Sequence, residues 1–164
     1  MQNNQFYFGE NGFKQNSKII KNLISELPKP VVFTNGVFDI LHIGHIRYLQ
    51  ESKKLGSSLV VGINSNQSTK MLKKGKNRPI IDEKDRSEIV ASIKAVDLCI
   101  IFDQQTPEDL IKLIRPEIYT KGADYNKDTI TYNQTLTDIN IKTVFIPLID
   151  NKSSSKIIDR IINY

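Results

Sequence analysis

Two histidines stand three residues apart where a short apolar strand gives way to an amphipathic helix. The segment runs Thr34-Asn35-Gly36-Val37-Phe38-Asp39-Ile40-Leu41-His42-Ile43-Gly44-His45. Apolar residues at positions 31–33 predict the strand, and those after the histidines recur at helical spacing. His42 and His45 therefore share one face of the first helical turn, where unpaired backbone N–H groups and the helix dipole attract an anion. Gly44 lacks a Cβ and lets a nucleotide approach the backbone, so the segment predicts a phosphate site.

Each histidine taken alone has a structural explanation, one capping the strand and the other packing on the helix. These are, however, the protein's two histidines, and they flank a glycine at a strand-to-helix junction. That clustering favours a binding site. Asp39, three residues before His42, is suited either to capping the coming helix or to assisting a metal or phosphate site.

Positive charge is concentrated in a second segment, which also contains Gly75 and Asn77. Its basic residues are Lys70, Lys73, Lys74, Lys76 and Arg78. The composition predicts an exposed, mobile loop. Such a loop is either merely solvated or able to close over the β and γ phosphates of a triphosphate and neutralise the departing pyrophosphate.

Strands alternate with amphipathic helices along the chain and position these segments. The pattern predicts strands at 31–35, 58–63, 98–102, 117–120 and 142–146, and helices at 16–26, 44–55, 83–94, 107–114, about 127–138, and from Ser153 onward. This order predicts a Rossmann-like α/β fold, a doubly wound parallel sheet of about five strands. We expect one domain over residues 16–164, preceded by an irregular extension at 1–15. Ligands of such sheets bind beyond the carboxyl ends of the strands.

Composition limits the classes of protein to which this chain can belong. The 164 residues are 39% hydrophobic and 25% charged, which is typical of a globular domain and not of a disordered chain. No apolar run is long enough to span a bilayer, and the N-terminus lacks the features of a secretory signal, so we expect a cytoplasmic protein. The net charge of +5 is not arranged as a basic stripe with interleaved aromatics, which argues against nucleic-acid binding. Cys99, the single cysteine, is expected to be a buried core thiol.

The histidine segment resembles the signature of the nucleotidyltransferase superfamily that carries a His-x-Gly-His motif, and within it most closely the adenylyltransferases of ADP-heptose synthesis. Further matches are Lys74-Gly75-x-x-Arg78-Pro79, Arg86, Lys121-Gly122-x-Asp124-Tyr125 and Ser153-Ser154-Ser155-Lys156-Ile157-Ile158. The resemblance covers about residues 16 to 162, nearly the whole chain.

The resemblance implies transfer of AMP from ATP to a heptose 1-phosphate, giving ADP-heptose and pyrophosphate for lipopolysaccharide or surface heptose synthesis. It also implies Mg²⁺ as cofactor and a heptose kinase in the same pathway, either fused or separate. Dimerisation is common in the resembling family, and a homodimer is an expectation here.

Residue roles follow from the same resemblance. His42 and His45 are expected at the α-phosphate, and Lys73 or Lys74 together with Arg86 at the β and γ phosphates. The other expected nucleotide-binding residues are Thr34, Asn35, Gly36, Phe38, Asp39, Gly44, Lys121, Gly122, Asp124, Ser153, Ser154 and Ser155. Asp39 is also the candidate metal ligand. The three serines have a structural alternative, since serine is a preferred helix cap.

Two features of the sequence bear on the alternatives that remain. The basic loop is one residue longer than usual, so either Lys73 or Lys74 is the catalytic lysine. Residues 150–152 lack the arginine that the cytidylyltransferases of this type carry, which argues against that branch. The alternatives are a cytidylyltransferase acting on glycerol 3-phosphate, a guanylyltransferase acting on a heptose phosphate, and a non-catalytic nucleotide-binding module.

Overall fold

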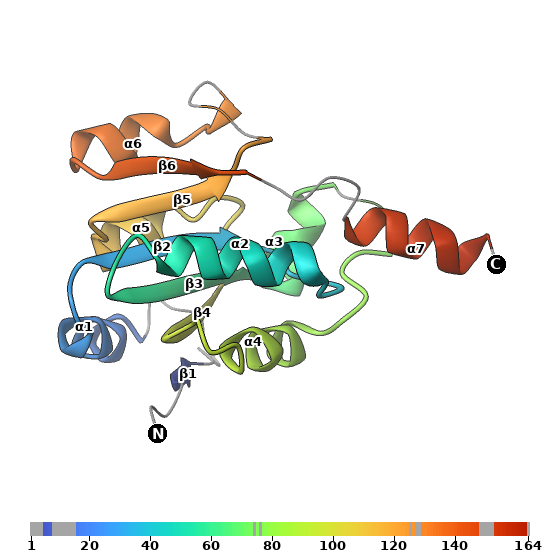
Figure 1. The fold of residues 1–164 in the computed structure, drawn as a ribbon, viewed down its shortest axis with the longest axis horizontal. Helices are drawn as coiled ribbons and strands as arrows, with labels where there is room; N and C mark the ends of the chain where they lie inside the picture. The colour runs from blue at the N-terminus through green and yellow to red at the C-terminus, as the bar shows by residue number, and fades with distance from the viewer. Residues whose placement is uncertain are drawn as a thin grey trace.

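A parallel sheet forms the centre of the molecule. The computed structural model describes residues 5–7, 16–73, 75, 77–124, 126, 129–147 and 153–163. Its strands are β1 (Gln5–Tyr7), β2 (Val31–Gly36), β3 (Ser58–Asn64), β4 (Leu98–Phe102), β5 (Ile118–Gly122) and β6 (Lys142–Ile146). Their order across the sheet is β1-β4-β3-β2-β5-β6, and every pair is parallel (Figure 1).

Helices cover both faces of this sheet. They are α1 (Ser17–Glu26), α2 (Ile43–Lys53), α3 (Asn66–Met71), α4 (Glu83–Ala91), α5 (Glu108–Ile114), α6 (Asn133–Asp138) and α7 (Ser154–Ile162). One apolar core joins α1, α5 and α6 to the sheet, and the other joins α2 and α4 to the opposite face. Helix α7 buries none of its residues and extends away from the sheet (Figure 1). The predicted doubly wound parallel sheet is therefore confirmed.

The strand order reverses beside β2. The chain runs outward from β2 through β3 to β4, then returns to place β5 against the other edge of β2. In doubly wound sheets ligands bind at this reversal, beyond the carboxyl ends of the strands. The described part of the chain holds no helix that is both long and apolar enough to cross a membrane.

Three elements differ from the sequence prediction. Residues Gln5–Tyr7, expected within an irregular extension, form a sixth strand beside β4. Helix α3 occupies 66–71, ahead of and partly within the expected basic loop, and α6 begins at Asn133 where a helix from about 127 was expected. Each element is only three to six residues long, and such lengths are too short for hydrophobic periodicity to identify.

Cys99 is fully buried in the core shared with α2 and α4, as predicted. Burial raises the pKa of its thiol well above the ordinary value, because the thiolate is disfavoured in apolar surroundings. Cys99 is therefore a packing residue.

Gly56 allows the turn before β3 to pass close to the start of β2. A Cβ built there would lie 2.6 Å from the Pro30 carbonyl oxygen, which accepts hydrogen bonds from the backbone N–H groups of Ser57 and Ser58 and so has no freedom to move away. We expect Gly56→Ala to lower the free energy of unfolding by about 1–3 kcal/mol, measured by denaturant titration. The exposed neighbour provides the control, because Ser57→Ala should leave stability unchanged. Equal stabilities for the two variants would contradict this packing argument.

Candidate active site

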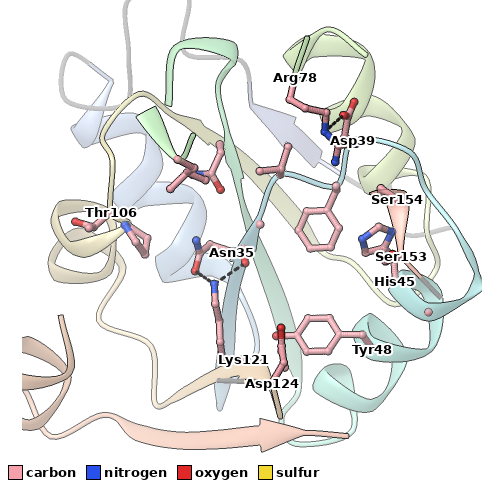
Figure 2. Close-up of a pocket in the computed structure, with 18 of the residues that line it drawn as sticks. Asn35, Asp39, His45, Tyr48, Arg78, Thr106, Lys121, Asp124, Ser153 and Ser154 are labelled. Carbon is pink, nitrogen blue, oxygen red and sulfur yellow. Dashed lines mark hydrogen bonds and ion pairs between the residues drawn. The ribbon is translucent and has the colours of Figure 1, made fainter. Parts of the chain in front are cut away.

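A cavity of about 620 Å³ opens at the carboxyl ends of β2 and β5, where the strand order reverses. It is lined from β2, the following loop, α2, β5 and the start of α7. Figure 2 shows His45, Ser153 and Ser154 on one side, Thr106 on the opposite side, and Asn35 and Lys121 between them. The fold therefore brings the histidine segment, the segment 121–124 and the three serines to one cavity.

His42 and His45 form the start of α2. His42 is the helix N-cap, and its Nδ1 accepts a hydrogen bond from the Gly44 backbone N–H at 3.2 Å. The His45 Nδ1 accepts from the His42 backbone N–H at 3.4 Å, and the two rings stack with centroids 3.9 Å apart. Because each Nδ1 is an acceptor, each neutral ring carries its proton on Nε2. The capping interactions thus set both rings to the tautomer that offers an Nε2–H donor.

Phe38 supports the histidine pair from within the motif. Its backbone adopts a left-handed conformation with φ of 50°, which is uncommon for a bulky residue and costs energy. Its ring lies 5.3 Å from the His45 ring, between centroids. Gly36 permits this fold-back, because a Cβ there would lie 2.9 Å from the Phe38 ring. Glycine at position 36 and phenylalanine at 38 therefore act together to place an aromatic wall beside His45.

Asn35 is held by a hydrogen-bond network at the end of β2. The Tyr119 hydroxyl donates to Asn35 Oδ1 at 2.7 Å and contacts the Tyr132 hydroxyl at 2.6 Å. The Lys121 ammonium donates to both the backbone and side-chain oxygens of Asn35, each at 3.2 Å (Figure 2). This network fixes the orientation of the Asn35 amide and holds a cation between β2 and β5.

Thr34 points to the opposite side of β2 from Asn35. It is fully buried, its hydroxyl lies 2.7 Å from the Tyr48 hydroxyl, and it donates to the Thr120 carbonyl at 3.1 Å. Thr34 does not line the cavity, and its contact with Tyr48 of α2 does not support the predicted nucleotide-binding role. Burial raises the pKa of Tyr48, although its hydrogen bonds oppose this, and the hydroxyl stays protonated at neutral pH.

The three serines lie at the start of α7. Ser153 is the N-cap and accepts from the Lys156 backbone N–H at 3.2 Å, while the Ser154 hydroxyl donates to the Ile40 carbonyl at 3.1 Å. All three line the cavity. The capping alternative therefore holds for Ser153, and Ser154 joins the second helix terminus to the histidine motif.

Asp39 does not cap α2, because His42 occupies that position. Its side chain is fully buried, and Oδ1 accepts from the backbone N–H groups of Ile80 and Ile81 at 2.9 Å each. Oδ2 lies 3.0 Å from Arg78 Nε as an ion pair that is not aligned as a hydrogen bond. Asp39 thus ties the end of the basic loop to the histidine motif.

Arg86 lies beneath the site and is absent from its lining. The side chain is fully buried, and its guanidinium donates to the carbonyls of Ile81 and Val37 and to the Asn66 amide oxygen. Desolvation lowers its pKa, and the nearby carboxylates of Asp39, Glu83 and Asp82 oppose that shift. Its donors serve the protein, so these contacts do not support the predicted role of Arg86 at the β and γ phosphates.

Of the two candidate lysines, Lys73 is exposed and does not line the cavity, and Lys74 lies outside the described residues. The remaining predicted nucleotide-binding residues line the cavity. They are Asn35, Gly36, Phe38, Asp39, Gly44, Lys121, Gly122, Asp124, Ser153, Ser154 and Ser155.

Several lining residues escaped the sequence analysis. They are Val37, Tyr48, Asn64, Leu72, Gln105, Thr106, Pro107, Thr129, Ile130, Thr131 and Tyr132. Arg78 also lines the cavity, and the sequence predicts it only as one cation of the basic loop. Asn64 ends β3, and Gln105 and Thr106 closely follow β4, so the rule that parallel strands end at one edge would have found these three. The residues at 129–132 lie between β5 and α6, without a sequence pattern that marks them.

Charged side chains of the described lining balance one another: Arg78 and Lys121 against Asp39 and Asp124. Within the described lining, a net attraction for anions therefore depends on groups other than charged side chains. The N-termini of α2 and α7, which both open on the cavity, supply backbone N–H groups and positive dipole ends.

A protein-built metal centre is not found in the described part of the chain, where no three His, Cys, Asp or Glu residues cluster suitably. Both Asp39 oxygens already face protein donors, so these contacts do not support its predicted role as metal ligand. Asp124 is the other carboxylate among the described lining residues.

Comparisons with known proteins agree on the class of this fold. The family model described as "Cytidylyltransferase-like" matches residues 33–160. "Bifunctional protein HldE" of Campylobacter fetus is 46% identical over 133 residues, covering 81% of this chain and 28% of the relative. The protein of the same name from Aliarcobacter butzleri is 42% identical over 150 residues, covering 91% and 30%. This chain spans less than a third of the length of these curated relatives.

Solved structures show the same architecture. The lipopolysaccharide core biosynthesis protein from Thermoplasma volcanium is 34% identical, with a TM-score of 0.65 over 73% of this chain and 98% of that one. Pantothenate synthetase from Thermus thermophilus shares the fold at 15% identity and a TM-score of 0.61, covering 84% of this chain and 65% of that one.

Proposed function

Because the chain belongs to the cytidylyltransferase-like family, we propose that it is a nucleotidyltransferase that transfers AMP from ATP to a heptose 1-phosphate. The products are ADP-heptose and pyrophosphate, and the product serves lipopolysaccharide or surface heptose synthesis. The relatives named HldE and the lipopolysaccharide core biosynthesis protein support this assignment of the pathway.

The observation that carries the proposal is the histidine pair at the start of α2. Two stacked rings, each with its Nε2 protonated, stand at a helix N-terminus on the wall of a cavity at the strand reversal. Donors held in this way stabilise negative charge that develops on an α-phosphate, and they need no reorganisation during the reaction.

In the proposed reaction an oxygen of the sugar phosphate attacks the α-phosphorus of ATP in line. A new P–O bond forms as the bond from the α-phosphorus to the bridging oxygen breaks, and pyrophosphate leaves with that electron pair. The nucleophile is already an anion, so no general base is required. Catalysis then depends on positioning and on charge stabilisation, as in phosphoryl transfer generally.

The acceptor sugar would occupy the half of the cavity opposite the serines. This half is polar and rich in uncharged donors and acceptors, with Asn35, Asn64, Gln105 and Thr106 at the ends of β2, β3 and β4. Amide and hydroxyl groups of this kind recognise sugar hydroxyls, and Lys121 beside them is suited to the sugar's phosphate.

Mg²⁺ would be held mainly by the phosphates of the substrates, since it prefers substrate phosphates and water over an all-protein cage. Asp124 is the carboxylate of the described lining suited to assist it. A heptose kinase supplies the acceptor, and the enzyme acts in the cytoplasm, where ATP is available. We also propose a homodimer, because dimerisation is common in the family that the sequence resembles.

The test is a matrix of pyrophosphate release with Mg²⁺, in which ATP, CTP and GTP are each combined with heptose 1-phosphate or glycerol 3-phosphate. We expect turnover only with ATP and heptose 1-phosphate. Turnover only with CTP and glycerol 3-phosphate, or only with GTP and the heptose, would replace the proposed substrates and leave the reaction class intact. Triphosphate binding without turnover in any combination would favour a non-catalytic nucleotide-binding module.

A further inference from the structure

Two arginines flank the buried carboxylate of Asp39, and their surroundings differ. Arg78 lines the cavity, whereas Arg86 is fully buried below it. We propose, on the basis of the function proposed above, that Arg78 binds the phosphates of the nucleotide and that Arg86 instead positions His45 through the Val37–Phe38 turn. The sequence predicts a phosphate role for Arg86 by residue, and for Arg78 only as one cation of the basic loop.

Arg78 is preorganised at the cavity wall. Its Nε lies 3.0 Å from Asp39 Oδ2 (Figure 2). Its side chain remains 13% exposed. Asp39 Oδ1 also binds the backbone N–H groups of Ile80 and Ile81, which anchors the chain just after Arg78. The Nε side of the Arg78 guanidinium therefore faces the Asp39 carboxylate. The other N–H donors of this planar group lie on its two Nη nitrogens.

Arg86 donates hydrogen bonds to three acceptors within the protein. Its Nε donates to the Ile81 carbonyl at 2.9 Å, Nη1 donates to the Val37 carbonyl, and Nη2 donates to the Asn66 amide oxygen at 3.1 Å. The carboxylates of Asp39, Glu83 and Asp82 act on the same guanidinium. Its charge is therefore used within the fold, beneath the wall that Phe38 and His45 form.

The contact with Val37 connects Arg86 to the chemistry. The Val37 carbonyl precedes Phe38, whose left-handed backbone must be held in place by surrounding contacts. Phe38 packs against His45, and His45 stacks on His42. Loss of the Arg86 fork should release the turn, shift the Phe38 ring and change the orientation of His45. Lysine cannot replace the fork, because a single ammonium does not match three acceptors spread across a plane.

The experiment compares Arg78→Gln with Arg86→Lys, and Arg115→Gln provides the control. Arg115 is an exposed arginine that precedes the amino-terminal end of β5, whereas the cavity opens at the carboxyl ends of the strands. Direct titration with ATP and Mg²⁺ gives the dissociation constant, pyrophosphate release gives kcat and KM, and ¹⁵N NMR reports ring tautomer and environment. Because the protein contains two histidines, each ring is resolved and assigned by single substitution.

We expect Arg78→Gln to weaken ATP binding about 10- to 100-fold, the loss expected for hydrogen bonds to a charged group, without changing the histidine signals. Arg86→Lys should lower kcat more than it raises KM and should shift the His45 signals. Phe38→Leu, which leaves Arg86 in place, should shift His45 in the same way and covers the case in which Arg86→Lys fails to fold. Arg115→Gln should match wild type throughout.

The inference is overturned if Arg78→Gln binds ATP as wild type does, or if Arg86→Lys weakens binding as much as Arg78→Gln with unchanged histidine signals. Unchanged histidine signals in Phe38→Leu would also overturn the positioning role. These binding and NMR readouts need no turnover. If wild type binds ATP but shows no turnover, the proposed reaction fails while the roles of the two arginines are still decided.

Discussion

Replacement of His45 by alanine is expected to lower kcat/KM for pyrophosphate release by about 100- to 1,000-fold, the usual cost of removing one preorganised donor to a developing negative charge. The loss should appear mainly in kcat, because the donor acts most strongly on the charge that develops at the α-phosphate. His45 also accepts from the His42 backbone N–H, so the variant loses one capping interaction. That loss should cost about 1 kcal/mol of stability, and the variant should remain folded.

A matched variant separates the donor from the cap. The amide of His45→Gln has an oxygen that can accept from the His42 backbone N–H and a nitrogen that can donate, but it cannot stack as an imidazole does on His42. We expect its activity to fall between those of alanine and wild type, with thermal unfolding close to wild type. Full activity in the folded alanine variant would contradict a role for His45 in charge stabilisation.

The fold could be predicted because its main elements are long and strongly patterned. Strands β3 and β4 are buried along their whole length, and a continuous apolar run in the sequence is typical of a central parallel strand. Strand β1 escaped prediction for the opposite reason. Its three residues are defined by pairing with β4, a tertiary contact between segments more than ninety positions apart.

The site could be predicted where its chemistry is local. His42, Gly44 and His45 lie within one helical turn, and the structure places all three at the cavity as their spacing predicted. Thr34 and Asn35 show the limit. Consecutive strand residues face opposite sides of the sheet, so only one of them reaches the cavity, and the sequence does not say which side that is.

The two arginines show what requires the tertiary structure. Arg78 and Arg86 are eight positions apart, and either matches a phosphate-binding role on residue type alone. Only the packing of α4 under the histidine motif shows that Arg86 is buried, and only the contact with Asp39 shows that Arg78 is held at the cavity. The direction of a long side chain depends on contacts that are distant in sequence.

Removal of the Asp39 carboxylate is expected to produce the largest loss of stability among the site residues. Asp39→Ala leaves Arg78 and Arg86 without their central anion and the backbone N–H groups of Ile80 and Ile81 without an acceptor. Breaking a buried pair by removing one partner costs about 3–5 kcal/mol. Here Arg78 loses its paired anion, and two backbone N–H groups lose their acceptor. We expect a decrease of this size in the free energy of unfolding, measured by denaturant titration.

Asp124→Ala provides the matched control, because this second carboxylate of the described lining is exposed and its removal should leave stability near that of wild type. Asp39→Asn should lie between the two variants: its amide oxygen still accepts from Ile80 and Ile81, but its amide group brings no charge to Arg78. Because Asp39 joins the loop that carries Arg78 to the histidine motif, ATP binding should weaken in Asp39→Asn even where the protein remains folded. Equal stability of Asp39→Ala and Asp124→Ala would show that the carboxylate does not hold these segments together.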